Sequence, residues 1–259
     1  MTKITTVFAA AFTAFTTYGG LPVVAIAQSP ALSDDAIYDI SRLNGYTARV
    51  GWRIVYNVEN STAVCRGEGS AIFLGGGLFL TAAHVVDQNP KKNECAPAGK
   101  VNPFVEFGST TMEAKIIALQ QWDEDLGSIF YADGMDLALL EVDKRMMQPE
   151  LRSEVYHRVC ESDLNAPGTE VKVSTEYGVY DAKTLPSQTL YSRLDFAGKH
   201  GDSGGGVFDE RRYCLLGIVS SGGHSGSNYV TTQVVRRFLE QSMAMDSMHA
   251  KAQAHSASP

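Results

Sequence analysis

The pattern of short apolar segments separated by turn residues is the feature that most restricts the fold of this chain. From Gly51 onward, strand-length runs rich in Val, Ile, Phe and Tyr, such as "GSAIFL", "EAKIIAL" and "YCLLGIVSS", are bounded by Gly, Asn, Pro or Asp. Strands so numerous and so short are typical of antiparallel barrels or sandwiches. The sequence therefore predicts an all-β protein.

Two segments depart from the strand pattern. Residues 234–245, "VVRRFLEQSMAM", predict a C-terminal helix, because apolar side chains recur at helical spacing and Thr231 or Thr232 precedes them as an N-cap. The stretch over 148–159, "QPELRSEVYHRV", is a weaker helix candidate or a linker between two halves. Residues 244–259 have no apolar face and predict a disordered tail.

The first 27 residues have the form of a secretory signal. One cation, Lys3, precedes a long uncharged run that ends in Ala25-Ile26-Ala27, which is a small-x-small signal-peptidase site. A lasting membrane anchor is the alternative, but Gly19-Gly20 and Pro22 interrupt the apolar run. We therefore expect a secreted or periplasmic protein without a membrane anchor, with Gln28 as its mature N-terminus.

The charge and the scattered histidines exclude several classes of function. A net charge of −7 without a basic cluster argues against nucleic acid as the main partner. No His-x-x-x-His or Cys-x-x-Cys pair occurs, and the acidic stretch 123–125 is more typical of a solvated loop than of a calcium site. We expect neither a metal nor a cofactor.

The segment 199–208, "KHGDSGGGVF", carries the chemistry. A Gly-x-Ser-x-Gly core lets a serine hydroxyl be approached from several sides, and two unrelated hydrolase designs use it. In the α/β-hydrolase design a helix follows the serine and the histidine comes last, whereas a strand follows Ser203 and the later histidines, His224, His249 and His255, lie in a loop and the tail. The other design has the order His, Asp, Ser, which "TAAHVV" and "GMDLALLEV" upstream provide.

The ordered motifs TAAH, DLALL, GDSGG and GIVSSGG resemble those of the trypsin-like (chymotrypsin-fold) serine peptidases. The resemblance runs from about Leu43 to Phe238. It implies two antiparallel β-barrels with the active site in the cleft between them and a C-terminal α-helix, with the peptidase domain at 43–243.

The resemblance also implies the roles of three residues. Ser203 would attack the scissile carbonyl of a protein or peptide substrate, His84 would take and return the proton, and Asp136 would orient the imidazole. This acyl-enzyme chemistry needs no cofactor. A non-catalytic binding module on the same fold is the rival interpretation, and the intact triad argues against it.

The glycines around Ser203 are explained by the same resemblance. Gly201 and Ser203 would present their backbone N–H groups as the oxyanion hole, while Gly204 and Gly205 turn the chain away. A tight hairpin turn is the alternative, but it would not need Asp202 before the serine.

Asp202 would pair with an N-terminal ammonium that activation sets free. The segment "SRLNGYTARVG" loosely resembles the family's activation junction, so we predict a prosegment at 28–42 and cleavage after Arg42 by an activating protease, which would free Leu43. The alternative is an enzyme that is active without this step and uses an internal cation.

The substrate pocket is predicted from positions around the nucleophile. The family's pocket base lies six residues before the nucleophile, and here it is alanine, which leaves a buried Lys or Arg side chain uncompensated. We expect an uncharged, apolar or aromatic P1 side chain, or alternatively an acidic residue near Lys199 and His200. The candidate substrate-binding residues are Ala197, Gly198, His200, Val219, Ser220, Ser221, Gly222 and Ser227.

Four cysteines in an exported chain favour two disulfides, although the sequence alone permits three pairings. The family's commonest cysteine, directly after the catalytic histidine, is replaced by Val85 here. By comparison with the family pattern we expect two disulfides, one between Cys65 and Cys95, which bracket His84, and one between Cys160 and Cys214.

Overall fold

The computed structural model describes residues 38–58, 61–89, 101–120, 131, 134–152, 157–162, 166–187 and 191–243. The predicted signal, most of the predicted prosegment, Cys95 and the predicted tail lie outside the described residues.

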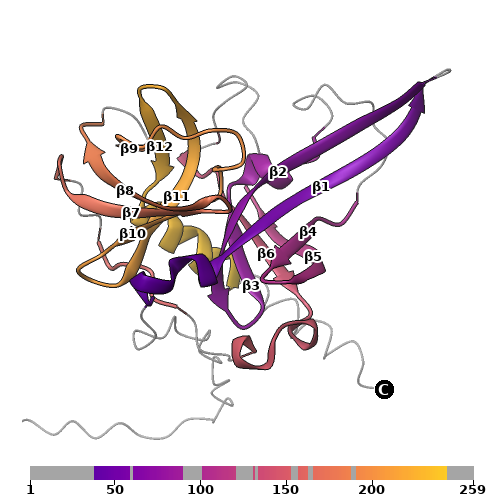
Figure 1. The fold of residues 1–259 in the computed structure, drawn as a ribbon, viewed down its shortest axis with the longest axis horizontal. Helices are drawn as coiled ribbons and strands as arrows, with labels where there is room; N and C mark the ends of the chain where they lie inside the picture. Colours follow the sequence, from indigo (N-terminus) through magenta and orange to yellow (C-terminus); the bar gives the residue numbers. More distant parts are fainter. Residues whose placement is uncertain are drawn as a thin grey trace, which may run out of the picture.

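The strands close into two antiparallel barrels, as predicted, and Figure 1 shows the barrels side by side. The first barrel has the strand order β1-β2-β3-β6-β5-β4 and the second has the order β10-β11-β12-β9-β8-β7. The strands of the first are β1 (Thr47–Val58), β2 (Ser61–Gly75), β3 (Leu78–Thr81), β4 (Phe104–Phe107), β5 (Thr110–Leu119) and β6 (Ala138–Val142). Those of the second are β7 (Glu170–Thr175), β8 (Gly178–Leu185), β9 (Ser192–Leu194), β10 (Gly206–Asp209), β11 (Cys214–Gly223) and β12 (Gly226–Val230).

Alternation of apolar and polar residues turns one face of each strand inward. In β5, Met112 and Ala114 are buried, whereas Thr111, Glu113 and Lys115 are exposed. Each barrel therefore closes around its own apolar side chains, and the first barrel's cluster continues into residues of the second.

The helical elements are short, except at the C-terminus. They are α1 (Ala83–Val86) and the 3-10 turns η1 (Ile40–Tyr46), η4 (Lys144–Met146) and η5 (Pro149–Leu151). The predicted C-terminal helix spans residues 232–243 and buries Val235, Phe238 and Leu239. In the described part of 148–159, only the three-residue turn η5 forms, and Val159 then pairs with Leu215 in β11, so that stretch is closer to the predicted linker.

The segment before β1 belongs to the fold. Tyr38 is fully buried, its N–H donates to the Tyr213 carbonyl, and its ring stacks on His157 at 4.6 Å and meets Phe208 edge-on at 4.8 Å. The first strand also begins at Thr47, earlier than Gly51. The reason is that residues 47–50 already pair with β2 and bury Ala48 and Val50.

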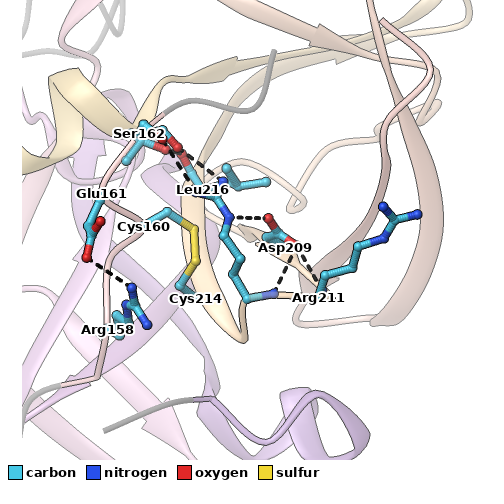
Figure 2. Close-up of a disulfide and its surroundings, with 10 residues drawn as sticks. Arg158, Cys160, Glu161, Ser162, Asp209, Arg211, Cys214 and Leu216 are labelled. Atoms are coloured by element: carbon cyan, nitrogen blue, oxygen red, sulfur yellow. Dashed lines mark hydrogen bonds and ion pairs between the residues drawn. A yellow bond between two sulfur atoms is a disulfide. The ribbon is translucent and has the colours of Figure 1, made fainter. Parts of the chain in front are cut away.

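The predicted disulfide Cys160–Cys214 is present and ties the connection between the barrels to the start of β11 (Figure 2). Beside it, buried Asp209 accepts hydrogen bonds from the backbone N–H groups of Arg211 and Arg212 and from Arg212 Nε at 2.6 Å. Cys65 is also disulfide-bonded, and its predicted partner lies outside the described residues. No helix within the described residues is long and apolar enough to cross a membrane.

Candidate active site

Strand register brings His84 and Asp136 together. Thr81 at the end of β3 pairs with Ala138 at the start of β6, so the residues just after β3 and just before β6 meet at one end of the first barrel. The single turn α1 buries Val85 and Val86 and leaves the His84 side chain 31% exposed. Its Nδ1 lies 2.7 Å from Asp136 Oδ2, and its backbone N–H donates to Asp136 Oδ1 at 3.0 Å.

The Asp136 carboxylate is buried and held in its charged form. Burial by itself raises its pKa, but the charge of His84 and the hydrogen bonds from His84 and Ser220 outweigh burial and hold the pKa below its ordinary value. The Ser220 hydroxyl donates to Asp136 Oδ2 at 2.5 Å. Asp136 is therefore able to orient the imidazole and to stabilise its protonated form.

Two tyrosines surround this carboxylate. Burial, with the nearby charge of Asp136, raises the pKa of Tyr191 to about 12 and raises that of Tyr131 still further. Tyr131 donates its hydroxyl to Asp87 at 3.2 Å. Both phenols stay neutral, so they add no negative charge beside Asp136.

Ser203 lies half-buried in the loop before β10, and its hydroxyl donates to the Ser220 carbonyl at 3.1 Å. No hydrogen bond joins Ser203 to His84 in the described part of the chain. Ser220 links the two side chains, because its hydroxyl donates to Asp136 while its carbonyl accepts the Ser203 hydroxyl. Bonds between nucleophile and base are often absent in free enzymes and form in the substrate complex.

The predicted oxyanion donors are free. The N–H groups of Gly201 and Ser203 have no acceptor among the described residues, whereas those of Asp202, Gly204 and Gly205 are all bonded to backbone carbonyls. Gly201 has φ 96°, a conformation that favours glycine. A Cβ on Gly204 would lie 1.9 Å from a backbone oxygen of β2. Within the described residues, the loop thus leaves the N–H groups of Gly201 and Ser203 unpaired.

Ser70 on β2 ties this loop to the first barrel. Its N–H donates to the Ser203 carbonyl at 2.7 Å and its hydroxyl donates to the Gly201 carbonyl at 2.8 Å. The same hydroxyl accepts the N–H of Glu176 at 2.9 Å, and Thr81 donates to the Ser70 carbonyl. Ser70 is fully buried, so these bonds are shielded from water.

In the intact chain no hydrogen bond or ion pair joins Leu43 to Asp202 among the described residues. Arg42 is exposed, while Leu43 is buried in the core of the first barrel and its carbonyl accepts the Thr47 hydroxyl. Asp202 is buried, its Oδ2 accepts the Lys199 N–H, and its Oδ1 has no partner among the described residues. No internal cation in this part of the chain contacts Asp202.

The predicted pocket walls touch each other. A Cβ on Gly222 would lie 2.9 Å from Gly198 Cα and 2.8 Å from Ser227 Oγ, so no space separates the two walls. The Ser227 hydroxyl donates to the Phe196 carbonyl at 2.6 Å and accepts the Gly198 N–H at 3.1 Å. Ala197, predicted to form the base, is exposed.

The remaining predicted substrate-binding residues differ in exposure. Val219 and Ser220 are buried, whereas Ser221 and Gly222 are exposed on the outer end of β11. His200 is exposed, and Lys199 Nζ lies 3.9 Å above the Tyr177 ring. Among the described residues, no group of three acidic, histidine or cysteine side chains is placed to bind a metal.

Sequence reasoning missed Ser70 and the second role of Ser220. A signal for Ser70 exists, since Gly67 and Gly69 directly before it indicate a close backbone approach within a strand. A Cβ on Gly69 would lie 2.6 Å from the Ser203 carbonyl oxygen. Nothing in the sequence marks the Ser220 hydroxyl as the one that faces Asp136.

Two antiparallel barrels that join a His-Asp pair to a serine in a glycine loop define a trypsin-like class of protein. The family model described as trypsin-like peptidase domain matches residues 69–218, and this chain belongs to that family. The chain is similar in fold to the crystal structure of Rv3671c protease from M. tuberculosis, active form, at 17% identity over 88% of this chain and 93% of that chain, with a TM-score of 0.53. No curated protein matches this chain.

Proposed function

We propose that this protein is a serine endopeptidase that cleaves peptide bonds through an acyl-enzyme on Ser203. The observation that carries the proposal is the continuous network from His84 through Asp136 and Ser220 to Ser203, beside the free N–H groups of Gly201 and Ser203. Membership of the trypsin-like peptidase family supports the same reaction type.

The reaction follows from the protonation states of the network. His84 accepts the Ser203 proton as Oγ attacks the scissile carbonyl, and the imidazolium is stabilised by the charged Asp136. The oxyanion accepts hydrogen bonds from Gly201 and Ser203. His84 then returns the proton to the leaving amine, and water hydrolyses the acyl-enzyme by the same steps in reverse order.

For the P1 side chain we propose a small, uncharged residue. Gly198 and Gly222 are in contact, with the Ser227 hydroxyl beside both, so they leave no slot for an aromatic ring. The prediction of an apolar or aromatic P1 residue is therefore narrowed to a small one. Cleavage profiling of a peptide library should favour P1 Ala, Ser or Val, and Ser227→Gly should admit larger apolar residues. A wild-type profile led by Phe or Arg would contradict this assignment.

The decisive test of activity is fluorophosphonate labelling of the whole mature protein, with the modified residue mapped by mass spectrometry. Label on Ser203 that is absent from Ser203→Ala supports the peptidase. Label that appears only after limited cleavage at Arg42 would indicate a zymogen. Absence of label both before and after that cleavage would refute an activated nucleophile and favour the binding-module alternative.

Export and activation are proposed from the sequence and tested together by N-terminal sequencing of the active protein. An end at Gln28 would support signal removal without further cleavage, and an end at Leu43 would support activation after Arg42. The burial of Tyr38 and Leu43 favours the first outcome, because cleavage after Arg42 would have to draw Leu43 out of the core before it could reach Asp202.

A further inference from the structure

The outer half of the β1–β2 hairpin projects beyond both barrels (Figure 1). β4 pairs with β1 only over Arg49–Gly51, and β3 pairs with β2 only from Ile72 toward Gly75. Farther out, within the described residues, the two strands pair only with each other, as far as Val58 opposite Ser61. A two-stranded ribbon of this length buries little by itself, so its exposed side chains are open to a partner.

One face of this ribbon is apolar and cationic. Val55 lies opposite Val64, with exposed fractions of 55% and 46%, and Arg53 lies opposite Arg66, both exposed. Because side chains alternate along a strand, these four residues share one side, which we call the arm face. Like charges directly opposite each other destabilise a strand pair unless an anion joins them.

The two arginines of the arm face have no counter-ion. Neither Arg53 nor Arg66 makes an ion pair or side-chain hydrogen bond with any described residue. By contrast, Arg49 on the barrel end of the same strand contacts three carboxylates, those of Glu68, Glu106 and Glu176. In a chain of net charge −7, a pair of unneutralised cations beside exposed valines is complementary to an acidic segment with apolar residues.

The arm face is continuous with the nucleophile. The Ser70 N–H donates to the Ser203 carbonyl, and β2 runs outward from there, reaching Arg66 four residues away at about 3.3 Å per residue. Along the edge of β2 that faces away from β1, residues 66–69 pair with no strand of the described chain. An extended segment on the leaving-group side of a substrate can therefore add to this edge as an antiparallel strand.

We propose that the arm face binds an acidic, partly apolar segment of protein substrates on the leaving-group side of the cleaved bond. Substrate carboxylates pair with Arg53 and Arg66, and substrate apolar side chains cover Val55 and Val64. That the bound segment belongs to a substrate rests on the proposed peptidase function, but binding to the arm face can be tested without catalysis.

The binding test uses full-length Ser203→Ala protein and a fluorescein-labelled peptide of alternating Glu and Val, followed by anisotropy. The matched peptide replaces each Glu by Gln. We expect the Glu peptide to bind about ten-fold more tightly, and the preference to shrink as salt screens the arginines. Arg53→Ser with Arg66→Ser should abolish the preference, whereas Arg237→Ser, an exposed cation on the C-terminal helix, should keep it. Equal binding of both peptides, or an equal loss in the Arg237→Ser control, overturns the proposal.

The kinetic test compares two quenched-fluorescence substrates that are identical up to the second residue after the cleaved bond and then continue with Glu-Val or Gln-Val repeats. In the Arg53→Ser, Arg66→Ser variant, kcat/KM for the Glu substrate should fall about five- to ten-fold through KM, while a truncated substrate is cleaved unchanged. A loss on all three substrates would overturn the arm-face assignment. If the wild-type protein neither cleaves substrate nor labels, before or after limited cleavage at Arg42, the peptidase proposal fails, and the anisotropy result still decides the binding surface.

Discussion

Replacing Ser70 by alanine tests whether the oxyanion loop depends on its bond to the first barrel. The change removes the hydroxyl that donates to the Gly201 carbonyl at 2.8 Å and accepts the Glu176 N–H at 2.9 Å. The Gly201 carbonyl is then left without its bond in a buried region and the Glu176 N–H in a partly buried one, at about 1–3 kcal/mol each, so the free energy of unfolding should fall by about 2–6 kcal/mol.

The catalytic effect of Ser70→Ala should exceed what lost stability explains. Without its anchor the Gly201 peptide is free to turn its N–H away from the developing oxyanion. Deleting one such donor costs about 10²–10³-fold in kcat, and a displaced donor should cost less, about 10–100-fold, with KM nearly unchanged.

The matched control is Ser174→Ala. Ser174 is also fully buried and its hydroxyl bonds to Thr47 of the first barrel at 2.6 Å, but this hydroxyl makes no hydrogen bond to the loop among the described residues. Urea unfolding should show similar destabilisation of the two variants, and steady-state kinetics should show a kcat loss only for Ser70→Ala. If both variants retain kcat, Ser70 stabilises the fold and does not position the loop.

Three further changes have defined outcomes. Asp136→Asn should lower kcat about 10⁴-fold, because His84 loses the carboxylate that orients it; a loss below about ten-fold would argue that His84 is not the base. Serine in place of both Cys160 and Cys214, whose separation is 54 residues, should cost about 4 kcal/mol in urea unfolding, and an unchanged midpoint would exclude a stabilising role. Burial alone raises the pKa of Asp209, but bonds from Arg212 and neighbouring N–H groups lower it, so its stabilisation is present above a pH of about 3.9 and is lost as pH falls through the folded-state pKa. Asp209→Asn should therefore reduce stability at neutral pH and flatten its acid dependence, as checked by urea unfolding at several pH values.

The all-β class and the Ser203 neighbourhood could be predicted because their signals are local, whereas the two-barrel arrangement was implied only by the family resemblance. Short apolar runs between turn residues predict strands whatever their pairing partners are. The glycines around Ser203 indicate a backbone conformation or a close approach that a residue with a side chain would not allow. The approach of His84 to Asp136 was predicted only through the resemblance, and the register of β3 with β6 now supplies its geometric reason.

What could not be predicted depends on distant packing. The segment at Tyr38 has no periodicity, yet it is buried because the rings of Tyr46, His157 and Phe208 pack against it. The contact between Gly198 and Gly222 arises from two loops that no local pattern relates. Likewise, no local pattern in the sequence indicates that the Ser203 hydroxyl donates to the Ser220 carbonyl and not to His84.

The groups that we propose to act in catalysis come from both barrels, so the rate of the proposed reaction should depend on how the barrels are placed against each other. His84 and Asp136 come from one barrel and Ser203 and Ser220 from the other, and a misplacement of about 1 Å between reacting groups can cost 10²-fold in rate. Heat or denaturant that loosens the contact between the two barrels should abolish turnover while each barrel is still folded. The temperature at which activity is lost should therefore lie below the calorimetric midpoint of unfolding. The difference between these two temperatures then reports how rigidly the barrels are held against each other.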